Sequence, residues 1–395
     1  MAIILFEDSA HQTLLPLTYT RPVADLRIGI LTIAEKWGKY LNQSFSFLTE
    51  DYLQGKFPME IAADNLFING AVCPDAGLVE AINHLQTGEA LKLNGELIAA
   101  RLGENYAASF KFDADFDNVT NYEVDLPVVI RYPEDIFRKN DIELRKDFNL
   151  LTKGRTSTSI SSTNTIIGND FFAEEGAVAE CCTFNTTNGP IYLAANTEVW
   201  EGSHIRGAFA LCEHSQVKMG AKIYGATTVG PHSRVGGEIN NAVIWGYSAK
   251  GHEGYLGNSV LGEWCNIGAD SNNSNLKNNY AEVRLWDYPT QRFRKTGLQF
   301  CGLIMADHAK CGINTMFNTG TVVGVSANVF GAGFPRNFVA DFSWGGASGF
   351  EVYTIKKMFE TTEKVFARKE NRPFDDTEQE ILKKVFELTE EYRRF

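Results

Sequence analysis

The 395-residue sequence lacks a long apolar run, a basic run and any CxxC motif. No 18-residue apolar stretch occurs, so we expect no membrane-spanning helix. The apolar run at residues 2–6 is too short for a signal peptide. The seven cysteines are odd in number and lack metal-ligand spacing, which favours buried thiols in a reducing compartment over a zinc site. We therefore predict a cytoplasmic protein without a membrane partner.

The sequence also contains fewer basic than acidic residues. Thirty-seven Lys and Arg residues face 49 Asp and Glu residues, a net charge of −12. This balance argues against nucleic acid as a partner. It does not exclude a small anionic substrate, because a few local basic side chains can hold a phosphate. The chain is too long to fold around one hydrophobic core, which predicts either two domains or one domain with a repeat array.

The clearest positive signal is an aliphatic residue at every sixth position in the middle of the chain. This period matches neither an α-helix nor a simple strand. It predicts short strands joined by tight turns, three to a coil, with each aliphatic side chain inside a three-sided prism. We therefore expect a β-solenoid over roughly residues 160–335, whose first core positions are Leu193, Val199, Ile205, Leu211, Val217, Ile223, Val229 and Val235.

Three parts are expected along the chain. Residues 1–150 read as an α/β domain with a connecting helix, including a strand at 2–6, an amphipathic helix at 23–41 and a strand at 65–70. Residues 155–340 form the solenoid, interrupted by an inserted arm at 272–302. Residues 350–395 form a C-terminal helical segment, whose second helix starts with a capping signal at Asp375 and Glu378.

The period of six resembles the hexapeptide repeat of left-handed parallel β-helix acyltransferases. The resemblance implies a homotrimer that binds acyl-CoA in grooves between neighbouring prisms. One segment, "KGHEGYLGNSVLGEWCNIGADSNNSN" at residues 250–275, is similar to the acetyltransferase active site of bifunctional N-acetylglucosamine-1-phosphate uridyltransferase/glucosamine-1-phosphate acetyltransferases. This implies that His252 is the catalytic base, that Tyr255 and Asn266 contact the amino sugar, and that Asn275 orients the histidine side and the substrate.

These residue types suit acyl transfer from a thioester to an amine. The amine must react as a free base, and an imidazole can take its proton near neutral pH. A backbone N–H in the glycine-rich turn would stabilise the oxyanion. The alternative for His252 is an exposed turn residue without a catalytic role.

The sequence departs from that family where the sugar phosphate is held. Asn240 and Asn241 stand in place of a basic pair, and Asp270 replaces a glycine. We consider Lys250, Arg234, Lys277 and the arginines of the arm as the residues that could hold the sugar phosphate instead.

The first domain resembles the start of sugar nucleotidyltransferases in the stretch "LLPLTYTRPVADLRIGILTIAEKW". The family's glycine-rich phosphate loop is absent, because "FEDSAHQT" stands in its place, and Ala71 replaces the aspartate that binds Mg²⁺. Arg21, Asp25 and Arg27 are the candidate nucleotide-site residues, with salt bridges at a helix start as the alternative. Mg²⁺ is expected only if this domain is active.

Three functions follow. The leading hypothesis is an N-acetyltransferase that uses acetyl-CoA and an amino-sugar phosphate or sugar nucleotide. The alternative is a sugar-1-phosphate nucleotidyltransferase whose β-helix only trimerises. The third, a sugar-nucleotide-binding or scaffold protein, predicts ligand-induced stabilisation without product.

Overall fold

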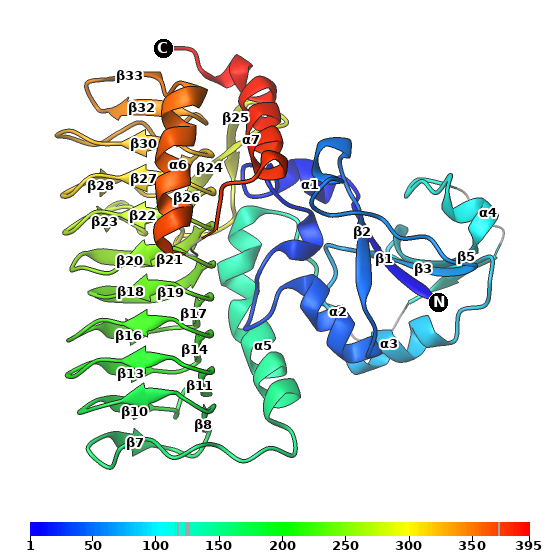
Figure 1. Ribbon diagram of the computed structural model, residues 1–395, viewed down its shortest axis with the longest axis horizontal. Helices are drawn as coiled ribbons and strands as arrows, with labels where there is room; N and C mark the ends of the chain where they lie inside the picture. The colour runs from blue at the N-terminus through cyan, green and yellow to red at the C-terminus, as the bar shows by residue number, and fades with distance from the viewer. Residues whose placement is uncertain (115, 117, 123–126, 370–371) are drawn as a thin grey trace. The chain divides into compact units, whose positions relative to one another are not determined.

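The computed structural model describes residues 1–114, 116, 118–122, 127–369 and 372–395. The chain divides into two compact units. Unit 1 comprises residues 1–26 and 31–132, and unit 2 comprises residues 27–30 and 133–395. Figure 1 shows the elements of both units.

Unit 1 is built on a mixed six-stranded sheet in the order β2-β1-β3-β5-β4-β6. Strand β1 pairs in parallel with β2 and β3, whereas β5 runs antiparallel to β3 and β4. The strands are β1 (Ala2–Phe6), β2 (Phe45–Leu48), β3 (Asp64–Asn69), β4 (Glu89–Leu93), β5 (Glu96–Gly103) and β6 (Asn118–Asn121). The helices are α1 (Ala10–Thr13), η1 (Val23–Asp25), α2 (Ile33–Leu41), η2 (Asp51–Leu53), α3 (Ala76–Asn83) and α4 (Glu104–Ala107). The predicted α/β class of this region is confirmed.

Helix α2 is shorter than the predicted helix at 23–41. It begins only after Thr32, whose side chain forms a reciprocal capping box with Glu35. The preceding residues 27–30 belong to unit 2, where the Gly29 N–H donates to Asn140 Oδ1 at 2.7 Å. Gly29 has a φ of +74°, a conformation that suits glycine and does not occur inside an α-helix. Tertiary hydrogen bonds therefore replaced the first half of the expected helix.

Unit 2 contains the predicted left-handed parallel β-helix. Its coils have three faces. Face 1 contains β7 (Thr165–Ile167), β10 (Thr183–Asn185), β13 (His204–Arg206), β16 (Lys222–Tyr224), the first halves of β19 (Glu238–Ile244) and β21 (Tyr255–Leu261), β23 (Asn272–Asn273) and β28 (Met316–Phe317). Face 2 contains β8 (Phe171–Ala173), β11 (Ile191–Leu193), β14 (Phe209–Leu211), β17 (Thr227–Val229), the second halves of β19 and β21, β26 (Leu303–Met305), β29 (Thr321–Val323) and β31 (Phe338–Val339).

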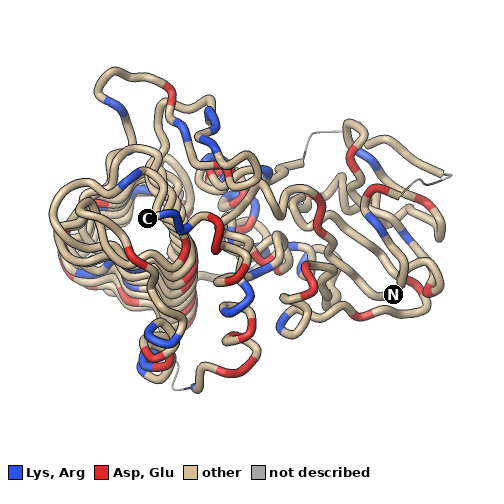
Figure 2. The backbone as a smooth tube through the Cα atoms, turned by 90° about the horizontal axis from the view of Figure 1, so that it is seen from above, with Lys and Arg blue, Asp and Glu red and all other residues tan. Residues whose placement is uncertain are grey.

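Face 3 is a ten-stranded sheet that is parallel except at its last pair. It contains β9 (Val178–Ala179), β12 (Glu198–Val199), β15 (Gln216–Val217), β18 (Arg234–Val235), β20 (Ala249–Lys250), β22 (Asn266–Ile267), β27 (Lys310–Cys311), β30 (Asn328–Val329), β32 (Ser343–Gly346) and β33 (Gly349–Val352). Figure 2 looks along the solenoid, and the coils superpose into one outline around the core.

The eight predicted six-period residues fill that core. Each is at most 2% exposed, and they belong to one continuous cluster that extends to Val339. A coil of this kind buries no closed core alone, so stacking supplies the hydrophobic stabilisation. The period of six is therefore confirmed as the repeat of a three-sided solenoid.

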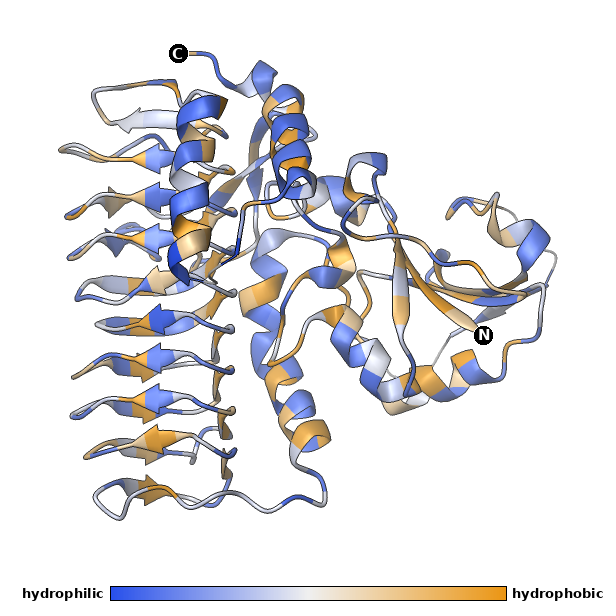
Figure 3. Cartoon of the chain, viewed as in Figure 1, coloured by the Kyte–Doolittle hydropathy of each residue, from blue (hydrophilic) through white to orange (hydrophobic). Residues whose placement is uncertain are grey.

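The helices of unit 2 cover parts of this solenoid. Helix α5 (Pro133–Thr152) lies against face 2, where the Asn140 side chain donates to the Ala226 carbonyl at 3.0 Å. Apolar and polar residues alternate along α5 in Figure 3. The C-terminal helices are α6 (Ile355–Lys369), α7 (Asp376–Leu388) and η3 (Glu390–Tyr392). The predicted cap is confirmed, because Asp375 accepts from the Glu378 N–H at 2.9 Å.

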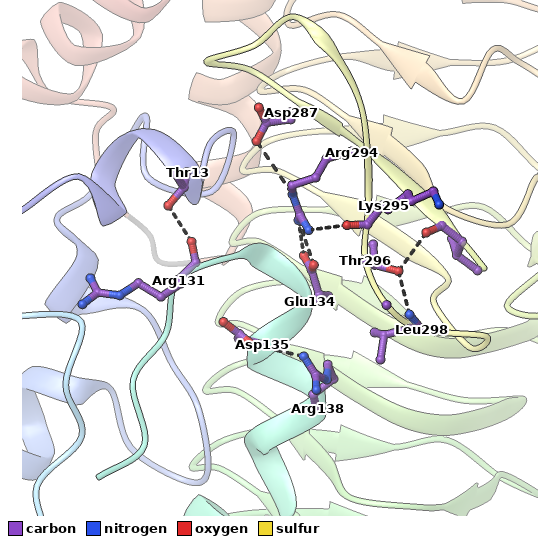
Figure 4. A network of polar contacts seen from close by, with 12 residues as sticks. Thr13, Arg131, Glu134, Asp135, Arg138, Asp287, Arg294, Lys295, Thr296 and Leu298 are labelled. Atoms are coloured by element: carbon purple, nitrogen blue, oxygen red, sulfur yellow. Dashed lines mark hydrogen bonds and ion pairs between the residues drawn. The ribbon is translucent and has the colours of Figure 1, made fainter. Parts of the chain in front are cut away.

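The inserted arm leaves the solenoid between faces 1 and 2. It folds as an antiparallel hairpin of β24 (Arg284–Asp287) and β25 (Arg292–Lys295). Figure 4 shows its anchor, in which Arg294 Nη2 donates to Glu134 Oε2 at 2.8 Å and lies 2.7 Å from Oε1 as an ion pair. Burial raises the pKa of Glu134, and the charge of Arg294 opposes that rise. Arg294 therefore has a structural role in holding the arm on α5.

Candidate functional site

His252 lies in the turn that connects β20 on face 3 to β21 on face 1. Glycines on both sides make this turn tight. Gly254 has a φ of +119°, and a Cβ atom there would lie 2.1 Å from the Ser271 carbonyl oxygen. The exposed His252 side chain is therefore carried on a backbone that is closely packed against the next coil.

Lys250 supports this turn from inside the prism. Its side chain is buried, and its ammonium group donates to the carbonyls of Gly236 at 2.9 Å and His252 at 2.7 Å. Burial lowers the pKa of Lys250 to about 8. These contacts give Lys250 a structural role, and its burial does not favour the predicted contact with a sugar phosphate.

A groove with a volume of about 750 Å³ runs along face 3, and His252 is one of its lining residues. Its floor is formed by outward side chains of successive coils, and the last turn of α6 supplies part of its wall. Figure 1 shows α6 lying along these coils. The groove also contains Asn266 and Arg234, so the structure brings three of the predicted site residues together.

The groove is strongly basic in an otherwise acidic chain. Five cationic side chains line it, and none of the described lining residues is acidic: the cations are Lys218, Arg234, Lys310, Arg368 and Lys369. Burial lowers the pKa of Lys310 to about 8. Burial, and then the charge of Lys310, lowers the pKa of Lys369 to about 8. An anion in this groove would be attracted by the positive charges and would offset their mutual repulsion.

A ladder of aromatic rings lines one corner of the coils beside the groove. The rings stack at centroid distances of 4.8, 4.9, 4.2 and 6.2 Å, and every one belongs to a residue with positive φ: His214, His232, Tyr247, Trp264 and His308. Phe366 of α6 stacks on Trp264 at 4.2 Å and so attaches the helix to the ladder. Flat rings and cations in one groove suit a ligand that carries both a planar ring and phosphates.

Tyr255 and Asn275 form a separate polar cluster on the face 1 side of His252. The Asn275 side-chain amide donates to the Tyr255 hydroxyl at 2.9 Å and to Asn258 Oδ1 at 2.7 Å. Neither Tyr255 nor Asn275 lines the groove. His252 therefore stands at the corner between a basic groove on one face and an uncharged hydrogen-bonding cluster on the next.

Lys277 lies in neither of these places. It is on the arm, its ammonium group donates to the Glu282 carbonyl at 2.9 Å, and it lines a second cavity there.

The candidate residues of unit 1 form a salt bridge. Arg21 pairs with Asp25 at 2.9 Å, and neither lines the cavity of about 510 Å³ at the carboxyl ends of β1 and β2. Arg27 belongs to unit 2, where its guanidinium donates to the Ile30 carbonyl. Ligands of open α/β sheets bind at the carboxyl ends of strands, so this cavity is the stronger candidate for a nucleotide site.

Asp8 is the main polar group of that cavity that the sequence analysis missed. It accepts from Asn69 and Arg131, each at 2.8 Å. Burial alone would raise the pKa of Asp8, but hydrogen bonds from the Ala10 N–H and Asn69, with the charge of Arg131, lower it overall. The position directly after a buried parallel strand was the signal that could have identified it.

The described residues contain no group of three or more His, Cys, Asp or Glu side chains arranged to hold a metal ion. Asn69 and Ala71 occupy the turn where the resemblance places a Mg²⁺-binding aspartate, and Asn69 is engaged with Asp8. This part of the chain therefore does not fit a preformed Mg²⁺ site. Within the same described residues, no helix is long and apolar enough to cross a membrane.

The sequence analysis also missed the cations and rings of the groove. His214 and His232 are 18 residues apart, which is one full coil. Aligning the sequence at this spacing would therefore have placed these two histidines of the ladder above one another. Arg368 and Lys369 carry no such signal, because they come from a helix distant in the sequence.

The fold and site thus define an α/β unit and a left-handed β-helix with a basic groove. Residues 3–156 match the family described as sugar nucleotidyl transferase, which confirms the resemblance of the amino-terminal part. No curated protein matches the chain.

Among solved structures, the chain is similar to UDP-N-acetylglucosamine acyltransferases from Arabidopsis and Campylobacter jejuni. The Arabidopsis structure has 16% identity and a TM-score of 0.23, covering 56% of this chain and 88% of that one. The Campylobacter jejuni structure has 13% identity and a TM-score of 0.20, covering 58% and 83%. The solenoid described above is defined by its own strand pairing, independently of these likenesses.

Proposed function

We propose that this protein transfers an acyl group from an acyl-CoA, acetyl-CoA in the first instance, to the amino group of a sugar phosphate or sugar nucleotide. The observation that carries this proposal is the position of His252 in the lining of a groove with five cations and no described acidic residue. His252 accepts the amine proton as the C–N bond forms. The C–S bond then breaks, and the proton passes to the leaving thiolate.

The groove is the proposed donor site. The phosphates of CoA would contact Arg234, Lys310 and Arg368, and its adenine would stack on the aromatic ladder. The acceptor sugar would lie on the face 1 side of His252, where Tyr255 and Asn275 present hydrogen-bonding groups, with Asn266 at the groove. We also propose a homotrimer, as the resemblance implies, which light scattering of the purified protein tests.

The direct test is release of free thiol from acetyl-CoA in the presence of a panel of amino-sugar 1-phosphates and UDP-amino sugars. We expect thiol release with at least one acceptor, together with a product heavier by one acetyl group. If no acceptor in the panel stimulates thiol release, the acyl-transfer proposal is wrong.

A charge test addresses the donor site. We expect Arg234→Ala and Arg368→Ala each to raise the KM for acetyl-CoA about 10-fold with little change in kcat, because each removes a charge-assisted hydrogen bond of about 1.5 kcal/mol. Lys364→Ala removes an exposed charge of α6 outside the groove and serves as the control. Equal KM values in all three variants would show that acetyl-CoA does not bind in this groove.

The same groove predicts a pH dependence. Lys310 and Lys369 have pKa values of about 8, so both lose their charge as the pH rises from 7 to 9. Because an anion binds more tightly to the protonated lysines, we expect the Kd of CoA to increase over this range. Calorimetric titration of CoA at pH 7, 8 and 9 measures it, and a Kd that falls with pH contradicts the assignment.

Nucleotidyl transfer by unit 1 is the second candidate. The match of residues 3–156 to sugar nucleotidyl transferases and the cavity beside Asp8 favour it. We expect pyrophosphate release from at least one NTP with Mg²⁺ and a sugar 1-phosphate, and at least a 10-fold loss in Asp8→Asn. Absence of pyrophosphate with all common NTPs would eliminate this candidate.

A further inference from the structure

The hairpin of the arm has two chemically different faces. Register pairs Leu285 with Arg294 on one face and Trp286 with Phe293 on the other. The first face is directed inward, because Leu285 is buried and Arg294 holds Glu134. Side chains alternate between the faces of a strand, so Arg284 shares the second face with Trp286. The second face therefore takes no part in anchoring the arm.

A cavity of about 650 Å³ lies on this second face. Its aromatic wall is a platform in which Trp286 stacks on Phe338 at 4.3 Å with a 12° interplanar angle, and Phe293 meets Trp286 edge-on at 5.4 Å. Phe338 is braced from behind by the buried Tyr288 ring at 5.5 Å. Phe293 is nevertheless 42% exposed, so the platform presents apolar surface to solvent.

The charges of the cavity have one sign. Lys277, Arg284 and Arg336 line it, and none of the described lining residues is acidic. Lys277 donates only to a backbone carbonyl. Neither the Arg284 side chain nor the Arg336 side chain has a hydrogen bond or ion pair with any residue that the structure describes. This arrangement differs from Arg294 on the same hairpin, which is paired with a carboxylate.

The platform also contains an unused donor. The indole nitrogen of Trp286 is buried and has no hydrogen-bond partner among the described residues. A buried donor without a partner costs about 1–3 kcal/mol, and tryptophan N–H groups usually find an acceptor. This nitrogen is closed to solvent, so the cavity meets Trp286 through its ring and not through its N–H group.

We propose that the arm cavity binds a nucleoside diphosphate. Its base packs against the exposed ring of Phe293 at the edge of the platform, and its phosphates lie between Arg284 and Arg336. The volume is within the range of small-molecule sites. The cavity is separate from the face 3 groove, because the arm leaves the solenoid between faces 1 and 2, and the assignment does not depend on acyl transfer.

Calorimetric titration of the full chain with UDP, ADP, uridine and inorganic pyrophosphate tests this site. We expect UDP or ADP to bind more tightly than uridine and pyrophosphate, because only the nucleotides combine a ring with phosphates. The double variant Arg284→Ala/Arg336→Ala should weaken nucleotide binding at least 10-fold. Trp286→Phe leaves a smaller ring in the platform, so a weaker loss than in the double arginine variant is expected.

Two controls separate this site from other binding. Arg292→Ala removes an exposed charge of the same hairpin outside the cavity and should leave the affinity unchanged. Arg234→Ala/Arg368→Ala alters the face 3 groove and should leave the arm site intact, which distinguishes failure of either proposal. Nucleotide affinity that is unchanged in Arg284→Ala/Arg336→Ala overturns the proposal. A loss of oligomer in that variant, without nucleotide binding in the parent protein, also overturns it, because the cavity is then a protein interface.

Discussion

Replacing His252 with alanine is expected to lower the kcat of acyl transfer by about 10²–10⁴-fold, the range of a lost general base. The change should be confined to the chemical step. The five Lys and Arg residues of the groove are all retained in this variant, so the KM for acetyl-CoA should change little. Thiol release at saturating acetyl-CoA and acceptor measures the effect.

The fold should tolerate this substitution, because the His252 side chain is exposed and its turn is held by Lys250 through the backbone carbonyl. We expect a stability change within about 0.5 kcal/mol. His204→Ala, an exposed histidine on face 1, is the matched control and should retain full activity. Unchanged turnover in His252→Ala would assign the base to another residue.

Arg294→Ala should be the most destabilising single change in the arm. It leaves Glu134, which is only 2% exposed, without its guanidinium partner. Breaking a buried pair on one side costs about 3–5 kcal/mol, because the remaining charge stays buried and uncompensated. The free energy of unfolding of unit 2, obtained from denaturant titration, measures this loss.

The pair also offers an internal check. Glu134→Gln/Arg294→Met removes both charges and should recover part of the lost stability, since replacement of a whole buried pair is often nearly neutral. Arg292→Ala, on the same strand but exposed, should cost no more than about 0.5 kcal/mol. A loss below 1 kcal/mol in Arg294→Ala would show that the arm has another anchor.

Much of the fold was predictable because it depends on local repetition. Each coil buries its aliphatic residues in the same way, so positions such as Ile205 and Ile223 carry the same information about the core. The cap at Asp375 was likewise predictable, because its hydrogen bond connects residues three apart. Strand β1 followed from a short apolar run in the same manner.

The site was only partly predictable. The segment around His252 was identified from its resemblance, and the structure places Asn266 and Arg234 with it in the groove. The sequence did not reveal that Lys250 is buried and therefore poorly placed to contact a phosphate. A lysine directed into the prism has the same local sequence as one directed outward. The helix expected at 23–41 was too long because the tertiary hydrogen bond that the Gly29 N–H donates to Asn140 Oδ1 outweighs local helical preference.

By itself, the sequence determined the three-sided core, the helix cap at Asp375 and the turn that carries one imidazole, because short-range spacing specifies all three. Only the tertiary structure decided which charges meet. Arg368 and Lys369 come from the end of α6 to complete a basic groove with Arg234 and Lys310, and Arg294 crosses from the arm to Glu134. Charges and rings act over distances in space, and residues far apart in the chain become neighbours only after the core has formed.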